Sequence, residues 1–243
     1  MCIRDSDLAH EWIQSVVADH CAGDGRATFA DFKSFGFCDL YIVTTNLSKH
    51  CIQIFSTKAT PDVPVADAVL MSSSLPFYFE SVQYNGREFG SGDYYADGGL
   101  LYNYPIQVFD SPEFKHESRH FVHGVNWETL GFRLFTPVDL KDHHRKITSL
   151  VSYVESVLET IIELQDTLVM QSAIDRMRTI SISNCGVSTT DLQISPDLED
   201  PKYADLFASG QLATREYLNS YSLPTDHFFS IKAKLLDLIE KRF

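Results

Sequence analysis

The sequence is poor in positive charge and in cysteine, and it contains no long hydrophobic run. Lys and Arg number 20 against 33 Asp and Glu in 243 residues, a formal net charge of −13. An acidic surface repels phosphate backbones, which argues against a nucleic-acid-binding function. No stretch reaches the roughly 18 consecutive apolar residues of a membrane-spanning helix, so we expect no transmembrane segment. Transient contact with a membrane surface remains compatible with this composition.

The cysteines form neither a disulfide framework nor a zinc motif. They are Cys2, Cys21, Cys38, Cys51 and Cys185, an odd number without a C-x-x-C pair. This usage slightly favours a reducing compartment such as the cytoplasm. Phosphate-binding motifs of the G-x-x-x-x-G-K and G-x-G-x-x-G types are also absent.

The start of the chain does not read as the start of a domain. Its first six residues, MCIRDS, resemble a translated sequencing-adapter scar of the kind found on assembled metagenomic reading frames. We therefore expect residues 1–6 to be such a scar and residues 7–243 to form a single domain.

Strand and helix patterns alternate along the chain, which predicts an α/β fold. Strands are expected at 39–46, 51–56, 131–136 and 178–183, with a short one leading into Asp97. The first two are close enough to pair as a hairpin, and Asn85-Gly86 predicts another tight turn. Helices are expected at 7–22, 65–74, 105–109, 147–172, 201–221 and 228–243, and a loop at 110–129. The helix 147–172 is either a lid or a layer of the fold, and we favour the layer.

The most informative short motif is Asp97-Gly98-Gly99 at the end of a predicted strand. The carboxyl ends of strands line the ligand crevice in open α/β sheets. The glycines permit positive φ and close approach of another backbone or a substrate, so Asp97 could serve as a general base. Taken alone, the three residues are more often a simple turn.

Other candidate groups are weaker. Ser72, Ser73 and Ser74 lack the flanking glycines of a nucleophile elbow and are expected to bond backbone carbonyls at a helix end.

The histidines and paired aspartates are also poor metal sites. His116, His120 and His123 have a spacing that could gather zinc ligands on a helix, but their polar surroundings favour a loop. The adjacent pair at 143–144 is a poor chelator. Asp93 and Asp97 are too few ligands for a calcium site. No metal or other cofactor is predicted.

Several segments together resemble the patatin-like phospholipases. They are TFADF (28–32), DLYIVTTNLS (39–48), VADAVLMSSSLP (65–76), YADGGLLYNYPI (95–106), TLGFRL (129–134), NCGVSTTDLQIS (184–195) and LFASGQLATREYL (206–218). The resemblance covers about residues 28 to 218, and the helix ending in Ser-Ser-Ser-x-Pro followed by YADGGLLYNYPI is its most specific part.

The resemblance implies a three-layer α/β/α sandwich and hydrolysis of acyl esters in glycerolipids or phospholipids. It implies a Ser–Asp dyad without histidine or metal, in which Asp97 is the base and Gly98 and Gly99 support the motif. The family's serine lies in a G-x-S-x-G elbow after a Gly-rich oxyanion loop. Neither motif occurs in this sequence, where Glu88 stands between the only suitably spaced glycines, Gly86 and Gly90.

The expectation is therefore a C-terminal portion of the domain, incomplete at the N-terminus, with no nucleophile in this chain and no activity alone. The alternative is an inactive patatin-like module that binds lipid or protein. A histidine-dependent metal hydrolase is the third interpretation. Acyl-chain and headgroup preference, oligomeric state and compartment are not predicted.

Overall fold

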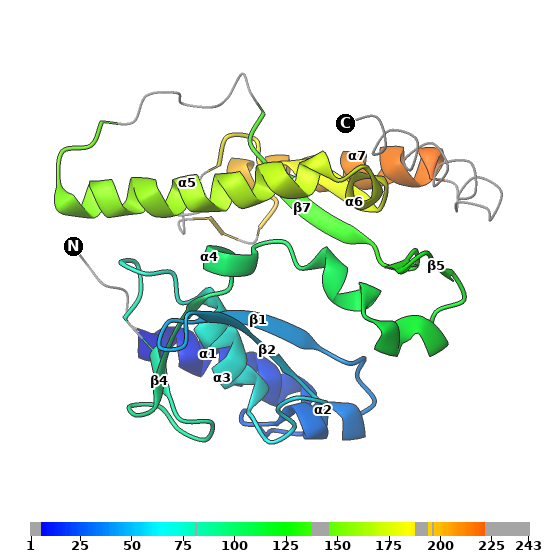
Figure 1. Ribbon diagram of the computed structural model, residues 1–243. Coiled ribbons are helices and arrows are strands. Elements are labelled where there is room, and N and C mark those ends of the chain that lie inside the picture. The colour runs from blue at the N-terminus through cyan, green and yellow to red at the C-terminus, as the bar shows by residue number, and fades with distance from the viewer. Residues whose placement is uncertain (1–5, 81, 138–145, 188–193, 196, 222–243) are drawn as a thin grey trace. The chain divides into compact units, whose positions relative to one another are not determined.

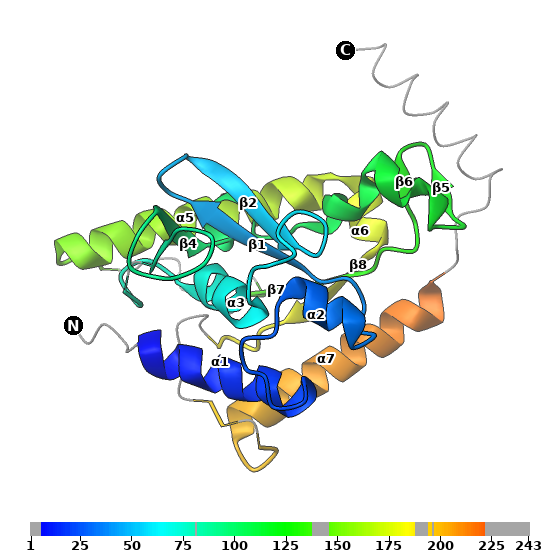
Figure 2. The ribbon, with the colours of Figure 1, turned by 90° about the horizontal axis from the view of Figure 1, so that it is seen from below.

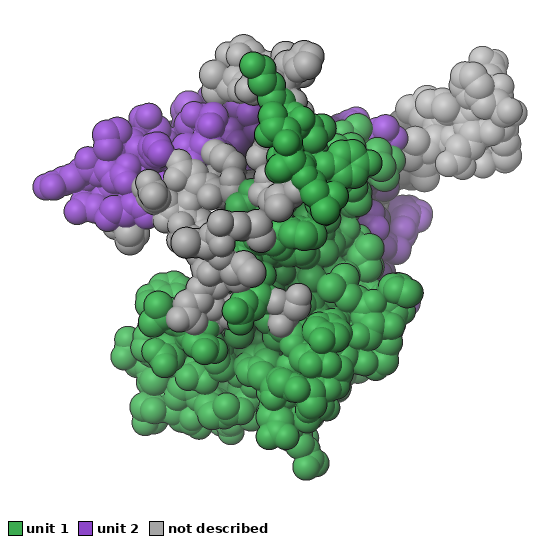
Figure 3. All heavy atoms as spheres, turned by 90° about the vertical axis from the view of Figure 1, so that its left-hand side faces the viewer, with its two compact units in different colours: residues 1–105, 146–168 green, residues 106–145, 169–243 purple. Residues whose placement is uncertain are grey.

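The computed structural model describes residues 6–80, 82–137, 146–187, 194–195 and 197–221. The chain divides into two compact units, one of residues 1–105 and 146–168 and the other of residues 106–145 and 169–243 (Figure 3). A single domain spanning both units stays a prediction.

Unit 1 is built on a four-stranded sheet of order β2-β1-β4-β3. Its strands are β1 (Tyr41–Asn46), β2 (Cys51–Ser56), β3 (Val82–Tyr84) and β4 (Asp93–Asp97). All three pairings are antiparallel, and β1 and β2 form the predicted hairpin with Tyr41 opposite Ser56. The turn at Asn85-Gly86 is also confirmed, because Gly86 has φ +97° and Tyr84 bridges to Phe89.

Helices cover both faces of this sheet (Figure 1). They are α1 (Ser6–His20), α2 (Phe29–Ser34), α3 (Val65–Ser73), α4 (Gly99–Tyr102) and α5 (Leu150–Gln171). Helices α1 and α3 pack on one side, whereas α4 lies against β1 on the other side and α5 lies beyond α4. Figure 2 shows the side that carries α1 and α3. The predicted α/β class and α/β/α layering are confirmed.

Local sequence explains where these helices begin. Thr28 caps α2 through a reciprocal capping box with Asp31, and Pro64 precedes the first residue of α3. The apolar face of α3 then meets the sheet, since Ala68 and Met71 are fully buried. The core of unit 1 combines side chains from these elements: Phe29, Ile42, Phe55, Val63, Val65, Ala68, Met71, Val82, Tyr84 and Tyr95.

Unit 2 contains a parallel pair of strands. These are β7 (Gly131–Phe135) and β8 (Thr179–Ser183), and α7 (Pro201–Ser220) packs on β8. Short elements complete it: η1 (Ile106–Asp110), η2 (Pro112–His116), β5 (Phe121–Val122), β6 (Val125–Asn126) and α6 (Ala173–Met177).

Several predicted boundaries need correction. The loop predicted at 110–129 contains η2 and the β5–β6 hairpin, whose two-residue strands are too short to show periodicity. The long helix begins at Leu150 and ends at Gln171, because the next residue, Ser172, caps α6 instead. The short helix predicted after Pro105 is the 3₁₀ helix η1. The predicted helix 228–243 and the histidine pair 143–144 lie outside the described residues.

Candidate active site at the end of strand β4

Asp97 is the last residue of β4 and is fixed by backbone contacts on both sides. Its N–H donates to the Ser74 carbonyl at 3.0 Å, and its carbonyl accepts from Thr45 Oγ1 at 2.9 Å. Asp97 does not lie in a ligand crevice at the carboxyl ends of parallel strands, because β4 is antiparallel to both of its neighbours. The end of α3 and strand β1 hold Asp97 in place.

Gly98 and Gly99 are needed for close approach rather than for positive φ. Gly98 has φ −61° and ψ −28°, so the positive φ that a glycine permits is not used here. A Cβ at Gly98 would overlap the carbonyl oxygen of Val43 and lie 2.8 Å from its carbonyl carbon. A Cβ at Gly99 would lie 3.0 Å from Asp97 Oδ1 and 2.9 Å from Asn103 Oδ1. The pair therefore lets the chain turn tightly against β1 and beneath the carboxylate.

The Asp97 carboxylate is half-buried and has one oxygen engaged by the protein. Gly99 N–H donates to Oδ1 at 2.7 Å, and the structure shows no partner for Oδ2 among the described residues. Burial raises the pKa of Asp97, and the hydrogen bond from Gly99 only partly offsets this rise. Such a carboxylate is more basic than an exposed one. It could accept a proton from a group placed near Oδ2.

Helix α5 supports the turn after Asp97 through one side chain. Gln165 Nε2 donates to the carbonyls of Gly99 at 3.1 Å and Leu100 at 2.9 Å. Its Oε1 accepts from Asn103 N–H at 3.0 Å. No motif in the sequence singles out Gln165. One feature of the sequence could have pointed to it. Gln165 is a polar residue on the apolar face of the predicted helix, next to Leu158 and Ile162.

The three serines bond backbone carbonyls, as predicted. Ser72 Oγ donates to Val43 at 2.7 Å, Ser74 Oγ donates to Leu70 at 2.6 Å, and Ser73 Oγ donates to Val69 at 3.0 Å. Each hydroxyl proton is thus directed at a carbonyl rather than at Asp97. None of the three serines is therefore placed as a nucleophile that Asp97 could activate.

Among the described residues, no group of three or more His, Cys, Asp or Glu side chains is arranged to hold a metal ion. His120 Nδ1 lies 3.0 Å from Glu128 Oε1, and His123 occupies the β5–β6 turn with φ +52°. Asp93 Oδ2 lies 2.7 Å from Lys49 Nζ and accepts from Asn46 Nδ2 at 3.0 Å. Asp93 is therefore held by an exposed cation rather than shared with Asp97.

A second buried carboxylate lies between α1 and α3. Asp67 is fully buried, and its Oδ1 lies 2.8 Å from His10 Nε2, while Arg26 approaches Oδ2 at 3.7 Å. Burial raises the pKa of Asp67 despite both partners. Burial, with a smaller effect of Asp67, also raises the pKa of Tyr84 to about 12. This cluster belongs to the core of unit 1 and has no open oxygen for a substrate.

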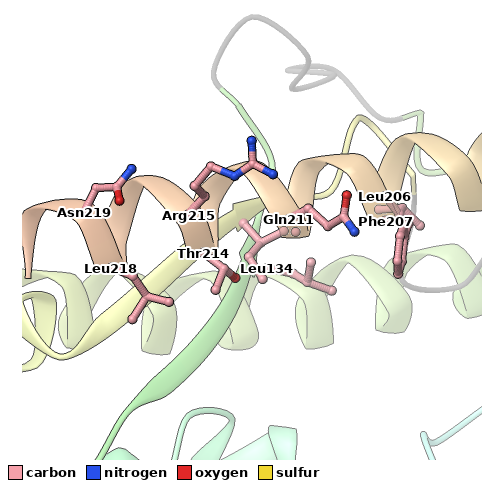
Figure 4. A pocket seen from close by; sticks show the side chains of 10 residues that line it. Leu134, Leu206, Phe207, Gln211, Thr214, Arg215, Leu218 and Asn219 are labelled. Carbon is pink, nitrogen blue, oxygen red and sulfur yellow. The ribbon is translucent and has the colours of Figure 1, made fainter.

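A groove lies in unit 2, between α7 and the β7–β8 pair. Its volume is about 790 Å³. Figure 4 shows Leu134 of β7 facing Thr214 and Leu218 of α7, with Arg215 directed away from the strand. Arg215 is the only ionisable residue in its lining, so the groove has no acid or base for chemistry. Asp97 is therefore the stronger candidate for a catalytic residue.

The geometry defines an α/β unit with a half-buried aspartate on an Asp-Gly-Gly turn. Residues 2–110, a little under half of the chain, match the family described as patatin-like phospholipase. This segment includes Asp97 and the complete four-stranded sheet.

Two viral proteins share shorter stretches with the chain. Protein R571 of Acanthamoeba polyphaga mimivirus is 44% identical over 72 residues, 30% of this chain and 22% of that protein. The probable lipid hydrolase 463L of Invertebrate iridescent virus 6 is 29% identical over 69 residues, 28% of this chain and 22% of that protein. The chain thus matches about a fifth of the length of these curated relatives.

A solved structure, VipD from Legionella pneumophila, aligns with 80% of this chain and 36% of its own, at a TM-score of 0.45 and 19% identity. Of the helices that the structure describes, none combines the length and apolarity needed to cross a bilayer.

Proposed function

We propose that this chain carries the aspartate-bearing part of a lipid acyl hydrolase, an esterase for glycerolipids or phospholipids. The observation that supports this most is the Asp97 carboxylate, whose Oδ1 is held by Gly99 N–H while Oδ2 faces no described partner. The match of residues 2–110 to the patatin-like phospholipases supports the substrate class. The relative 463L, described as a probable lipid hydrolase, agrees with it.

In the proposed mechanism, Asp97 is the base of a Ser–Asp dyad. Its carboxylate takes the serine hydroxyl proton while the serine oxygen attacks the ester carbonyl carbon. The alcohol leaves with a proton returned from Asp97, and an acyl-enzyme remains. Water then releases the fatty acid by the same proton transfers. Gly99 N–H fixes the carboxylate, and Gln165 fixes the turn. The dyad itself uses no metal or cofactor.

The proposed serine is not supplied by a recognisable elbow in this sequence. No G-x-S-x-G occurs, and the hydroxyls of Ser72, Ser73 and Ser74 donate to carbonyls. We therefore infer that the 243-residue chain alone is inactive and that the nucleophile belongs to further sequence of a longer reading frame.

The test compares this chain with the reading frame extended upstream, using short-chain ester and phosphatidylcholine substrates. We expect turnover from the extended protein only, with Asp97→Asn lowering kcat/KM by about 10²–10⁴-fold. Asp93→Asn is the matched control, since Asp93 lies on the same strand but pairs with Lys49. Near-normal turnover in Asp97→Asn contradicts the base role.

The pH profile gives a second readout. Because the pKa of Asp97 is raised by burial, the acidic limb of kcat/KM should lie above the range of an exposed aspartate. Activity should fall as Asp97 gains its proton. An extended frame that encodes no G-x-S-x-G and shows no turnover would favour the binding-module alternative.

A further inference from the structure

Helix α5 carries an apolar stripe of exposed side chains in unit 1. Six side chains spaced three or four residues apart form it, and at about 100° per residue they fall within an arc of about 80°. They are Leu150, Tyr153, Val157, Ile161, Leu164 and Leu168, with exposures between 40% and 78%. All six belong to unit 1. Scattered exposed apolar residues are ordinary, but a continuous stripe of this kind marks an interaction surface.

The remaining faces of α5 show how this stripe is oriented. Val154, Leu158 and Ile162 are less exposed and lie next to Gln165 on the helix, on the side that meets the α4 turn. Glu159 and Glu163 lie opposite the stripe. α5 contains no Lys or Arg. The stripe could therefore bind a flat apolar surface while the face of α5 that carries Glu159 and Glu163 stays in water.

The border of the stripe is suited to a medium of low polarity. Thr160 and Thr167 lie along one edge, and their hydroxyls donate to the carbonyls of Ser156 at 2.7 Å and Glu163 at 2.9 Å within the helix. Because these hydroxyl protons are already satisfied, desolvating this edge leaves no unpaired donor there.

The stripe is coupled to the candidate site through a single helix. Gln165 lies between Leu164 and Leu168 in sequence and bonds the carbonyls of Gly99 and Leu100 directly after Asp97. Figure 1 shows α5 on the side of the sheet that carries α4. A surface that binds this helix is thus held close to the turn that carries the proposed base.

We propose that the α5 stripe docks on the surface of a zwitterionic phospholipid membrane and presents its lipids to Asp97. This inference rests on the proposed function, which makes a lipid aggregate the source of substrate. A second copy is the less favoured occupant, because pairing would bring two chains of net charge −13 together. The acidic balance and the lack of basic residues on α5 select zwitterionic over anionic lipid.

The test measures flotation of the full chain with phosphatidylcholine vesicles. We expect binding of the wild type and at least about tenfold weaker partitioning of Leu164→Gln/Leu168→Gln, because two apolar side chains no longer enter the interface. The matched control is Leu212→Gln/Leu218→Gln on α7, where both leucines are 58% exposed, against 57% and 55% on α5. This control should bind like the wild type. Circular dichroism and urea unfolding check that both variants fold.

The other outcomes overturn the docking proposal. They are no binding to phosphatidylcholine, equal loss in the two double variants, or binding only to anionic vesicles that salt abolishes. A dimer in sedimentation equilibrium that the α5 double variant dissociates, without vesicle binding, assigns the stripe to a second copy. Vesicle binding requires no turnover, and Asp97→Asn should retain it. A failure of docking is therefore distinguishable from a failure of the proposed hydrolysis.

Discussion

At the scale of single residues, the tightest steric demand in the candidate site falls on Gly98. Replacing it with alanine would force the new Cβ into the backbone of Val43, which cannot rotate away. We expect Gly98→Ala to lower the free energy of unfolding by about 1–3 kcal/mol. Gly210→Ala is the control, because Gly210 lies inside α7 with open space around it and should gain up to about 1 kcal/mol. Urea unfolding measures both, and equal effects would contradict the steric role of Gly98.

Asp67 predicts a pH dependence of stability. Burial raises its pKa, so the folded state holds this proton more tightly than the unfolded state does. The free energy of unfolding therefore falls as pH rises from the pKa of Asp67 in the unfolded state to its higher pKa in the folded state. The loss persists at higher pH. Asp67→Asn removes this loss, so the stability of the variant relative to wild type should increase as pH rises above about 4.

Asp31 supplies the control of opposite sign. Hydrogen bonds from the Thr28 backbone and hydroxyl lower its pKa, so its contribution is present above the unfolded pKa and is lost as pH falls. Asp31→Asn should therefore be less stable than wild type above about pH 4, and this difference should shrink as pH falls below that value. A pH-independent difference between Asp67→Asn and wild type would refute the buried-charge argument.

Residue-level reasoning from the sequence predicted Asp97 and the carbonyl-bonded serines but missed their supports. The Asp-Gly-Gly motif is local, so the sequence alone can single it out, and the role of Asp97 as a base stays a prediction. Gln165 acts on carbonyls more than 60 positions away, and a contact of that range leaves no periodic signal. The glycine pair permits both positive φ and close approach of another backbone, and only the position of Val43, which the sequence does not reveal, decides between them.

At the scale of elements, one buried arginine connects η1, α6 and β8. Arg178 is 1% exposed, and its guanidinium donates to Asp110 Oδ1 at 2.6 Å and Asp175 Oδ1 at 2.7 Å. Burial alone would raise the pKa of Asp175, but hydrogen bonds from Arg178, Gln107 and Ser172 outweigh it and hold the pKa below its ordinary value. The network thus balances charges that are individually costly to bury.

Arg178→Met should destabilise unit 2 by about 3–5 kcal/mol, because it leaves two carboxylates without their cation. Arg178→Lys should rescue only part of the loss, since an ammonium cannot reproduce the paired donors. The control is Arg176→Met, whose side chain is exposed and donates only to the carbonyls of Met170 and Gln171 at the end of α5, so its loss should cost less than about 1 kcal/mol. Urea unfolding followed by circular dichroism measures the series, and a neutral Arg178→Met would show that the network contributes no net stability.

Long periodic elements were predictable, and short or polar ones were not. The 22 residues of α5 and the β1–β2 hairpin contain repeated apolar spacing. This spacing identifies each element even when its predicted first or last residue is wrong. The β5–β6 hairpin has two-residue strands in a histidine-rich stretch, so neither alternation nor hydrophobicity marks it. The start of α6 depended on a single serine cap, which no periodic pattern reveals.

At the scale of the whole molecule, charge sets a testable dependence on salt. With 33 acidic and 20 basic side chains, compact packing of the chain costs repulsion that counterions screen. We expect the melting temperature at pH 7.5 to rise by a few degrees between low and physiological NaCl. Near pH 5.0, the sequence isoelectric point, the net charge vanishes and the same salt step should have little effect. An equal salt response at both pH values would mean that specific ion binding, rather than net repulsion, governs stability.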